Sequence, residues 1–187
     1  MTDLPPPLPQ LLSHGLRIVF IGYNPAIYSA ERGHYYARPG NAFWKQLSAT
    51  SLVERPVTCE DDALLPSEAG IGFTDLCPRP TVRAEELTRD EVREGATSLY
   101  DRLVRFQPAI AVFSGRGIFD YFARFALELP PRHLRGRGYG PQPERMGETV
   151  PWVIPSSSGL ASRWHRERQE LMHCLAAEAP HWPSGPQ

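Results

Sequence analysis

The sequence predicts one α/β domain of three layers, in which helices flank a short, mainly parallel central sheet. Apolar, β-branched segments at residues 16–22 and 108–113 have the length and composition of buried strands. Segments with helical spacing, such as residues 88–106, alternate with these strands. A chain of 187 residues, 41% of them hydrophobic, can build a single core of ordinary domain size. This alternation favours a parallel sheet that is covered by helices on both faces.

The two ends of the chain offer little to bury. Residues 1–10 contain four prolines, and we expect a flexible arm there. The domain is predicted to occupy residues 11–180, with a short tail at 181–187. Inside the domain, residues 129–143 have the weakest pattern of regular structure, and the sequence contains no internal repeat.

The first half of the domain alternates strand, loop and helix signals. The strand at 16–22 ends at a glycine, and residues 23–40, rich in Gly, Pro, Tyr and Asn, have the composition of a loop. A helix is expected from Asn41, whose side chain is a good amino-terminal cap. An apolar stretch at 71–73 indicates another strand. Thr88-Arg-Asp-Glu has the spacing of a capping box and opens the next helix.

The second half repeats the alternation. Residues 108–113 form a predicted strand, and a helix is expected from 116 to 127. Residues 150–154 form the last strand, in which Pro151 favours an edge position or a strand start because proline lacks a backbone N–H. The closing helix is expected from 163 to 179.

Charge and cysteine content exclude several functional classes. The net charge is −1, so the chain is not a basic protein that coats nucleic acid, and a polyanion would need a local patch. Three cysteines, Cys59, Cys77 and Cys174, are too few for a disulfide framework or an iron–sulfur cluster. The histidines lack metal-ligand spacing, and we expect no metal and no cofactor.

The sequence also lacks targeting signals. No run approaches 18 apolar residues, and the first residues have neither a basic start nor an apolar stretch. We therefore expect no membrane span and no secretory signal. The expected compartment is the reduced cytoplasm.

Two polar loops mark the expected functional site. Residues 23–40 follow the first strand and residues 155–163 follow the last. In parallel sheets, sites form beyond the carboxyl ends of the strands, where such loops meet. The first loop contains Asn24, whose carboxamide can hold a water molecule but is not basic enough to deprotonate it. An Asn-Pro turn with no catalytic role is the alternative.

The motifs of these loops resemble those of the mismatch-specific uracil-DNA and thymine-DNA glycosylases, a branch of the uracil-DNA glycosylase superfamily. The first motif reads GYNPA at 22–26, followed by GHYYARPGNAFWK at 33–45, and the second reads IPSSSGLASR at 154–163. Similar segments lie between them in the same order, so the resemblance covers about residues 16–175. It implies a fold like that of uracil-DNA glycosylase, and a monofunctional DNA glycosylase that hydrolyses the N-glycosidic bond of uracil in mispaired duplex DNA.

The resemblance also implies roles for residues of the first loop. Asn24 would aim water at the sugar as the bond to the base breaks, a step in which positioning matters more than nucleophile strength. Tyr36 would stack on the extruded base, with Tyr35 as an alternative. Ser29 would line the pocket, or else lie on the surface. Asn41 would either contact the base or only cap its helix. Tyr23, where the family has an apolar residue, would narrow the pocket.

The second motif would face the DNA. Hydroxyl groups of Ser156, Ser157 and Ser158 can donate to phosphate, although they can also simply cap the last helix. Gly159 and Leu160 resemble the wedge that fills the space left by a flipped base. Arg163 opens a basic stretch suited to phosphate contact. Serine at position 156, where the uracil-type members have asparagine, favours the thymine-like branch, so thymine and other damaged bases are further candidate substrates.

Asp75 needs a separate interpretation, because members of this family do not generally carry an acid there. A carboxylate near the pocket can act as the base that Asn24 cannot be, or it can stabilise the cationic sugar electrostatically. It can equally cap a turn or pair with Arg79.

The expected partner is double-stranded DNA, bound by a monomer, and the expected place of action is the bacterial nucleoid. The competing hypotheses are a non-catalytic damaged-DNA binder of the same fold and a flavodoxin-like small-molecule domain, since fold does not fix function. The glycine motif at 115–117 is incomplete and counts against the second of these.

Overall fold

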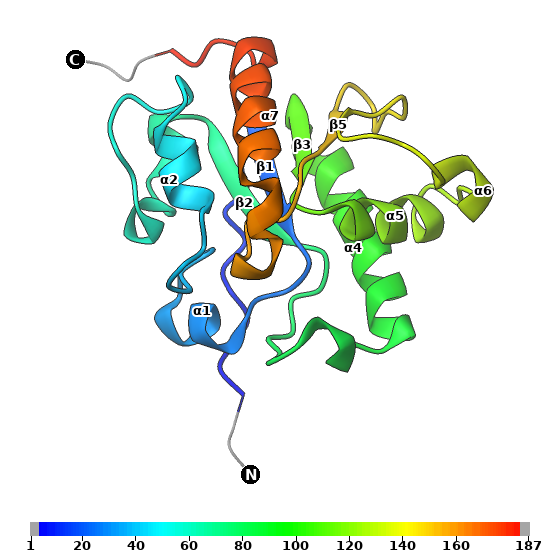
Figure 1. The fold of residues 1–187 in the computed structure, drawn as a ribbon. Coiled ribbons are helices and arrows are strands. Elements are labelled where there is room, and N and C mark those ends of the chain that lie inside the picture. Colours follow the sequence, from blue (N-terminus) through cyan, green and yellow to red (C-terminus); the bar gives the residue numbers. More distant parts are fainter. Residues whose placement is uncertain (1–3, 184–187) are drawn as a thin grey trace.

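A five-stranded sheet forms the centre of the protein (Figure 1). The computed structural model describes residues 4–183, apart from the side chains of residues 159, 160 and 162. The strands are ordered β2-β1-β3-β5-β4. All neighbours pair in parallel except β4, which lies antiparallel to β5 at one edge. The carboxyl ends of the parallel strands therefore meet at one edge of the sheet. The strands are β1 (Ile18–Gly22), β2 (Ile71–Asp75), β3 (Ile110–Phe113), β4 (Gly140–Pro141) and β5 (Val150–Val153).

Helices cover both faces of this sheet and give the three layers that the sequence predicts (Figure 1). One face is covered by α2 (Phe43–Ser48), α3 (Leu65–Glu68) and α7 (His165–Glu178). The other face is covered by α4 (Arg89–Phe106) and α5 (Arg116–Phe125). Two short helices, α1 (Ile27–Arg32) and α6 (Pro131–Leu134), lie in the connections.

Strand β1 shows why both faces must be covered. Ile18 and Phe20 point into the cluster beneath α2 and α7, whereas Val19 and Ile21 point into the cluster beneath α4 and α5. All four side chains are fully buried. Burial of a side chain of this size contributes about 1.5–3 kcal/mol, so a sheet with apolar residues on both faces is stable only between two helical layers.

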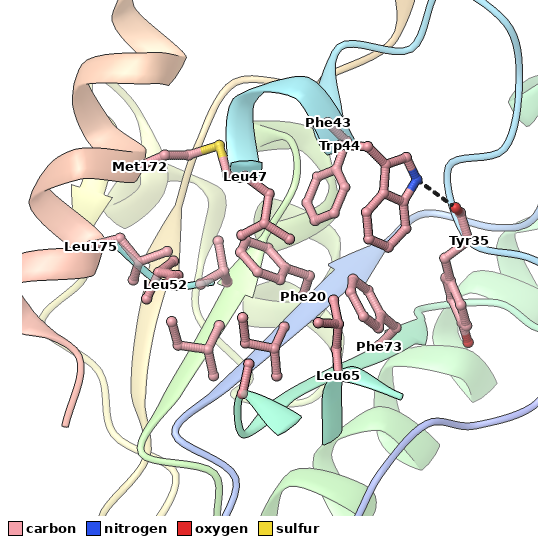
Figure 2. Packing of buried hydrophobic residues seen from close by; sticks show 14 of the residues in the cluster. Phe20, Tyr35, Phe43, Trp44, Leu47, Leu52, Leu65, Phe73, Met172 and Leu175 are labelled. Atoms are coloured by element: carbon pink, nitrogen blue, oxygen red, sulfur yellow. Dashed lines mark hydrogen bonds between the residues drawn. The ribbon is translucent and has the colours of Figure 1, made fainter. Parts of the chain in front are cut away.

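Aromatic rings dominate the layer between the sheet and α2 (Figure 2). Phe20 meets Phe43 edge-on at 4.9 Å between ring centroids, and Phe73 lies 5.5 Å from Trp44. The indole Nε1 of Trp44 donates to the backbone carbonyl of Tyr35 at 3.0 Å, the dashed line of Figure 2. These contacts fix the segment that carries residue 36 against the sheet, because buried aromatic pairs prefer such defined geometries.

The capping box at the start of α4 is confirmed. The Thr88 hydroxyl accepts from the backbone N–H of Glu91 at 3.2 Å, and the Glu91 carboxylate accepts from the Thr88 N–H at 2.8 Å. The strands expected at 16–22, 71–73, 108–113 and 150–154 are also present, with ends shifted by a few residues. Pro151 is the second residue of β5, so it lies at a strand start and not on an edge strand.

Short elements are where the structure departs from expectation. The loop expected at 23–40 contains α1, which ends at Gly33 in a left-handed conformation (φ 74°). The weakly patterned stretch at 129–143 contains α6 and β4. Elements of two to six residues have too little periodicity to be recognised in a sequence.

The ends of the domain are more ordered than their composition suggests. Leu8, in the expected flexible arm, is buried, and the carbonyl of Pro9 accepts a hydrogen bond from the Tyr35 hydroxyl at 2.9 Å. In the expected tail, the indole of Trp182 donates to the carbonyl of Ser67 at 3.2 Å. The rest of both ends, residues 1–3 and 184–187, lies outside the described residues. Within residues 4–183, no helix combines the length and apolarity that a membrane crossing requires.

Candidate functional site

A cavity of about 530 Å³ opens beyond the carboxyl ends of the parallel strands, where the sequence places the site. Its walls come from the turn after β1, from α1 and the segment before α2, and from the ends of β2 and β3. The turn after β5 closes the other side. All the predicted residues from the first loop, Asp75 and the three serines line it: Tyr23, Asn24, Ser29, Tyr35, Tyr36, Asn41, Asp75, Ser156, Ser157 and Ser158.

Asn24 is held by its amide nitrogen. Its Nδ2 donates to the carbonyl of Arg79 at 2.9 Å and to the hydroxyl of Thr81 at 2.8 Å. A carbonyl can only accept, so this contact fixes which way the carboxamide points. Among the described residues no donor reaches the Oδ1 atom of Asn24, which leaves that oxygen as the acceptor available at the cavity wall.

A backbone bridge holds the turn around Asn24. The N–H of Thr81 donates to the carbonyl of Pro25 at 3.1 Å, and the N–H of Ile27 donates back to the carbonyl of Thr81 at 3.3 Å. Ala26 has φ −68° in this bridge, an ordinary extended conformation. Alanine therefore fits here without backbone strain.

Asp75 ends β2, next to Gly22 at the end of β1. Its side chain is 5% exposed and lines the cavity. A Cβ atom on residue 22 would come within 2.2 Å of Asp75 Oδ1, so a larger residue at this position would displace the carboxylate from where it lies. Burial raises the pKa of Asp75 to about 7, and the positive charge of Arg102 opposes this rise.

The alternative in which Asp75 pairs with Arg79 is wrong. Arg79 instead forms an ion pair with Glu91, with 2.5 Å between Nε and Oε1. Arg102 approaches Asp75 only through the backbone, donating to its carbonyl oxygen at 3.0 Å. No described residue donates a hydrogen bond to the Asp75 carboxylate, so the group is free to act on whatever occupies the cavity.

Tyr36 and Tyr35 have separate positions. The Tyr36 ring stacks on Phe43, with 4.2 Å between centroids and 22° between planes, and its hydroxyl lies 3.1 Å from Ser114 Oγ. Tyr36 has φ 52°, a left-handed conformation that is uncommon outside glycine. Tyr35 is 2% exposed and packs in the core, donating from its hydroxyl to Pro9. Tyr36 is partly exposed and its ring is backed by Phe43, whereas Tyr35 is buried, which favours Tyr36 as the stacking platform.

Three further residues that the sequence predicts for the pocket line the cavity. Ser29 is 5% exposed in α1, so the alternative of a surface serine is wrong. Asn41 is not the cap of α2 that the sequence predicts, because the N-cap is Ala42; its Oδ1 accepts from the N–H of Phe43 at 3.0 Å, and the residue lines the cavity. Tyr23 lies 6.0 Å from Tyr121 between ring centroids, and burial raises its pKa to about 12. Their contacts with a base remain predictions.

The serine loop, residues 155–158, faces the first loop across the cavity. Ser156 Oγ accepts from the N–H of Ser158 at 3.3 Å, and Ser158 is exposed. Ser157 is buried, and its carbonyl accepts from the N–H of Ala42 at 3.1 Å. Contact of the Ser156 and Ser158 hydroxyl groups with DNA phosphate stays a prediction, whereas the burial of Ser157 counts against the same role for its hydroxyl.

The wedge proposed for the next residues falls in the 3₁₀ helix η3 (Gly159–Trp164), which precedes α7. The side chain of Leu160 lies outside the described residues, so the wedge itself is untested. Arg163 is exposed and its guanidinium packs 5.1 Å from the centre of the Trp164 ring. An exposed cation next to the serine loop remains suited to phosphate.

Several supporting residues received no role of their own from the sequence. Ser114 follows β3 and contacts Tyr36, and Thr81 fixes the Asn24 amide. Gln46 and Arg168 lie far apart in sequence and meet beside the serine loop. Isolated serine, threonine or arginine residues are too common to stand out, and only tertiary packing assigns them to the site. Among the described residues, no group of three or more His, Cys, Asp or Glu is placed to hold a metal ion.

Two comparisons with known proteins found similar sequences. A family model described as "Uracil DNA glycosylase superfamily" matches residues 9–177. The chain is also 34% identical over 176 residues to a protein of Schizosaccharomyces pombe named "G/U mismatch-specific uracil DNA glycosylase". That alignment covers 91% of this chain and 53% of the yeast protein, so the chain spans about half the length of this relative.

Proposed function

This chain belongs to the uracil DNA glycosylase superfamily, as its motifs predict, and we propose that it is a monofunctional DNA glycosylase. It removes uracil from mispaired duplex DNA by hydrolysing the N-glycosidic bond, and it leaves an abasic site. One observation carries the proposal: Asn24 with a free Oδ1 and Asp75 with an unpaired carboxylate line the same cavity. The name of the yeast relative supports a G/U mispair as the substrate.

The cavity serves a base that has left the DNA stack. A pyrimidine buried in a duplex is out of reach of Asn24, so the nucleotide must flip into the cavity, at a cost of a few kcal/mol. Tyr36 is backed on one face by Phe43, which supports stacking of the base on its other face. A base–aromatic stack contributes about 1–3 kcal/mol and recovers part of the cost of flipping.

Asn24 and Asp75 divide the work of activating water. The C1′–N1 bond breaks and its electron pair leaves with the base, so that positive charge develops on the sugar. Asn24 Oδ1 accepts a hydrogen bond from the water and aims it at C1′. As the new C–O bond forms, the Asp75 carboxylate takes a proton from that water. A pKa of about 7 for Asp75 suits this role near neutral pH.

The serine loop supplies the DNA contacts in this proposal. Hydroxyl groups of Ser156 and Ser158 donate to a phosphate, with Arg163 nearby as a cation, and Leu160 would fill the space left by the flipped base. Serine at position 156 supports thymine as a second substrate. We also infer a monomer, because one chain supplies all the walls of the cavity. Free thiols at Cys59, Cys77 and Cys174 support the cytoplasm as its compartment.

The decisive experiment is single-turnover excision from short duplexes that carry uracil, thymine, hypoxanthine or xanthine opposite each normal base. We expect alkali-labile abasic sites with uracil opposite guanine, and a rate that falls sharply in both Asn24→Ala and Asp75→Asn. Cys174→Ala is the matched control, because this thiol is exposed in α7 and distant in role from the cavity. Binding without abasic sites would instead identify a damaged-DNA binder. Unchanged turnover in both cavity variants would show that the water site lies elsewhere.

A further inference from the structure

Arg168 links three parts of the molecule that meet beside the cavity. It projects from α7, and its side chain is 1% exposed. Its Nε donates to Oε1 of Gln46 on α2, and its Nη1 donates to the backbone carbonyl of Ser156. Gln46 is equally buried, and its Nε2 donates to the carbonyl of His165 at 2.8 Å. This network therefore connects α2, the serine loop and the first turn of α7.

The guanidinium in this network has no counter-charge. Among the described residues, no carboxylate lies within 4.0 Å of it, and its hydrogen-bond acceptors are neutral. Burial lowers the pKa of Arg168, yet a guanidinium stays charged in proteins. The charge also lies near the amino end of α7, where the helix dipole is itself positive. A buried cation without a counter-charge lowers the stability of the fold, so its presence points to a role in binding.

The proposed function supplies an anion that matches this charge, namely a DNA phosphate. Ser156 presents its backbone carbonyl to Arg168 and its hydroxyl to Ser158, at the rim of the cavity. A phosphate held by these hydroxyl groups would lie above the buried guanidinium, with the loop between them. Charges separated by protein interact more strongly than charges separated by water.

We propose that Arg168 is the positioning residue of the serine loop, and that its unpaired charge attracts the DNA phosphate which that loop binds. The hydrogen bond to Ser156 sets the loop in its binding conformation before DNA arrives. The charge then adds an attraction that the neutral hydroxyl groups do not provide. The proposal rests on the proposed function, because it takes DNA as the ligand of the loop.

Gln46→Glu is the sharpest test. A glutamate keeps an oxygen acceptor for Arg168 Nε and pairs the buried cation with an anion, but it removes the Nε2 donor to the His165 carbonyl. The new ion pair offsets the lost hydrogen bond, so we expect a melting temperature close to that of the wild type, together with about tenfold weaker binding of a duplex that carries an abasic site opposite guanine. The slope of log Kd against log salt concentration should fall by about one. A merely structural role for the network predicts no loss of affinity when stability is kept.

Arg168→Met and Arg168→Lys separate position from charge. Methionine removes both, so we expect the lower salt slope together with lower stability, whereas lysine should keep the slope. The matched control is Arg17→Met. Arg17 is another arginine that donates to backbone carbonyls, those of Ala69 and Leu52, each at 2.6 Å, but it precedes β1 at the opposite edge of the sheet. Its loss should lower stability and leave the salt slope unchanged.

The outcomes distinguish this inference from the proposed function. If Gln46→Glu and Arg168→Met bind DNA with the affinity and salt slope of Arg17→Met, the inference is overturned even though uracil excision stands. If the wild-type protein binds duplex DNA without excising a base, the proposed function fails, and a lower slope in Gln46→Glu still supports the inference. A wild-type protein that neither binds nor cleaves duplex DNA overturns both.

Discussion

The two loops that enclose the cavity are held in different ways. The first, around Asn24, is fixed by neutral hydrogen bonds: the Arg79 carbonyl and Thr81 hydroxyl hold the amide, and a backbone bridge holds the turn. The second, the serine loop, is fixed to α2 and to a buried charge on α7, through Ala42 and Arg168. The first arrangement fixes the direction in which the Asn24 side chain points. The second places the positive charge of Arg168 close to the serine loop.

We expect this difference to give the two loops separate tasks. Changes in the first loop and at Asp75 should lower the rate of bond cleavage with little effect on DNA affinity. Changes in the serine loop and its support should weaken DNA binding first. Loss of an interaction made only in the transition state lowers the rate alone. Loss of an interaction made equally in the ground state lowers affinity.

Asn24→Ala tests the first half of this comparison with the largest expected effect. Loss of the oxygen that positions water should lower the single-turnover rate about 1,000-fold, because water is no longer aligned with the developing charge. Duplex affinity should change by less than about threefold. Rates at saturating enzyme and a titration with uncleaved duplex measure the two quantities. A loss of affinity as large as the loss of rate would contradict the division between the loops.

Asp75→Asn should lower the rate about 100-fold, the range expected for loss of a general base. In the wild-type protein the rate should rise with pH through about 7, as the carboxylate loses its proton. The variant should lack this rise. A variant with the wild-type pH profile would remove Asp75 from the reaction.

The same substitution should change stability in the opposite direction. The pKa of Asp75 is raised from 3.8 in the unfolded chain to about 7 in the fold, so the native state holds the extra proton between these values. Wild-type stability is therefore lost as pH rises from about 4 to 7. Above pH 7 we expect Asp75→Asn to be more stable by roughly 1–3 kcal/mol, and equal to wild type near pH 4. Thermal unfolding at both pH values measures the difference.

Thr81→Val sharpens the comparison, because it removes the hydroxyl that fixes the Asn24 amide and keeps the side-chain shape. The Arg79 carbonyl still holds the amide, so we expect only about a tenfold loss of rate, the value of one ordinary hydrogen bond. Thr81→Ser should restore most of it. Unchanged rate in the valine variant would mean that the Arg79 contact is sufficient.

Ser158→Ala has the smallest expected effect and addresses the second loop. Loss of one exposed donor should weaken duplex binding about threefold to tenfold, and the rate at saturation should stay near wild type. Ser51→Ala is the control, since this exposed serine lies between α2 and α3. A slower rate at saturation, with affinity unchanged, would place Ser158 in the chemistry instead.

How much of the fold was predictable depended on the length of each element. The strands at 16–22, 108–113 and 150–154 and the helix after Thr88 carry strong patterns, and all are present. Helix α1 was missed because six residues inside a loop-like composition give no periodicity. The order of Leu8 and Trp182 was also missed, since it depends on grooves that other segments create.

The same limit applied to the site. The motifs around Asn24 and Ser156 were predictable because each is a contiguous sequence with a characteristic spacing. Ser114 was not, because its hydroxyl becomes relevant only where β3 ends beside Tyr36. Arg168 was visible only as one cation in a basic stretch, and its burial against Gln46 depends on the crossing of α2 and α7.

The sequence by itself determined the alternation of strands and helices, the parallel sheet, and the loops that carry Asn24 and the serines. These follow from local composition, because strand and helix preferences are written in neighbouring residues. The tertiary structure alone decided that Asp75 is buried beside Gly22 with a raised pKa, and that Arg168 is buried without a counter-charge. Burial and electrostatic environment are set by residues distant in the chain, and only folding brings those residues together.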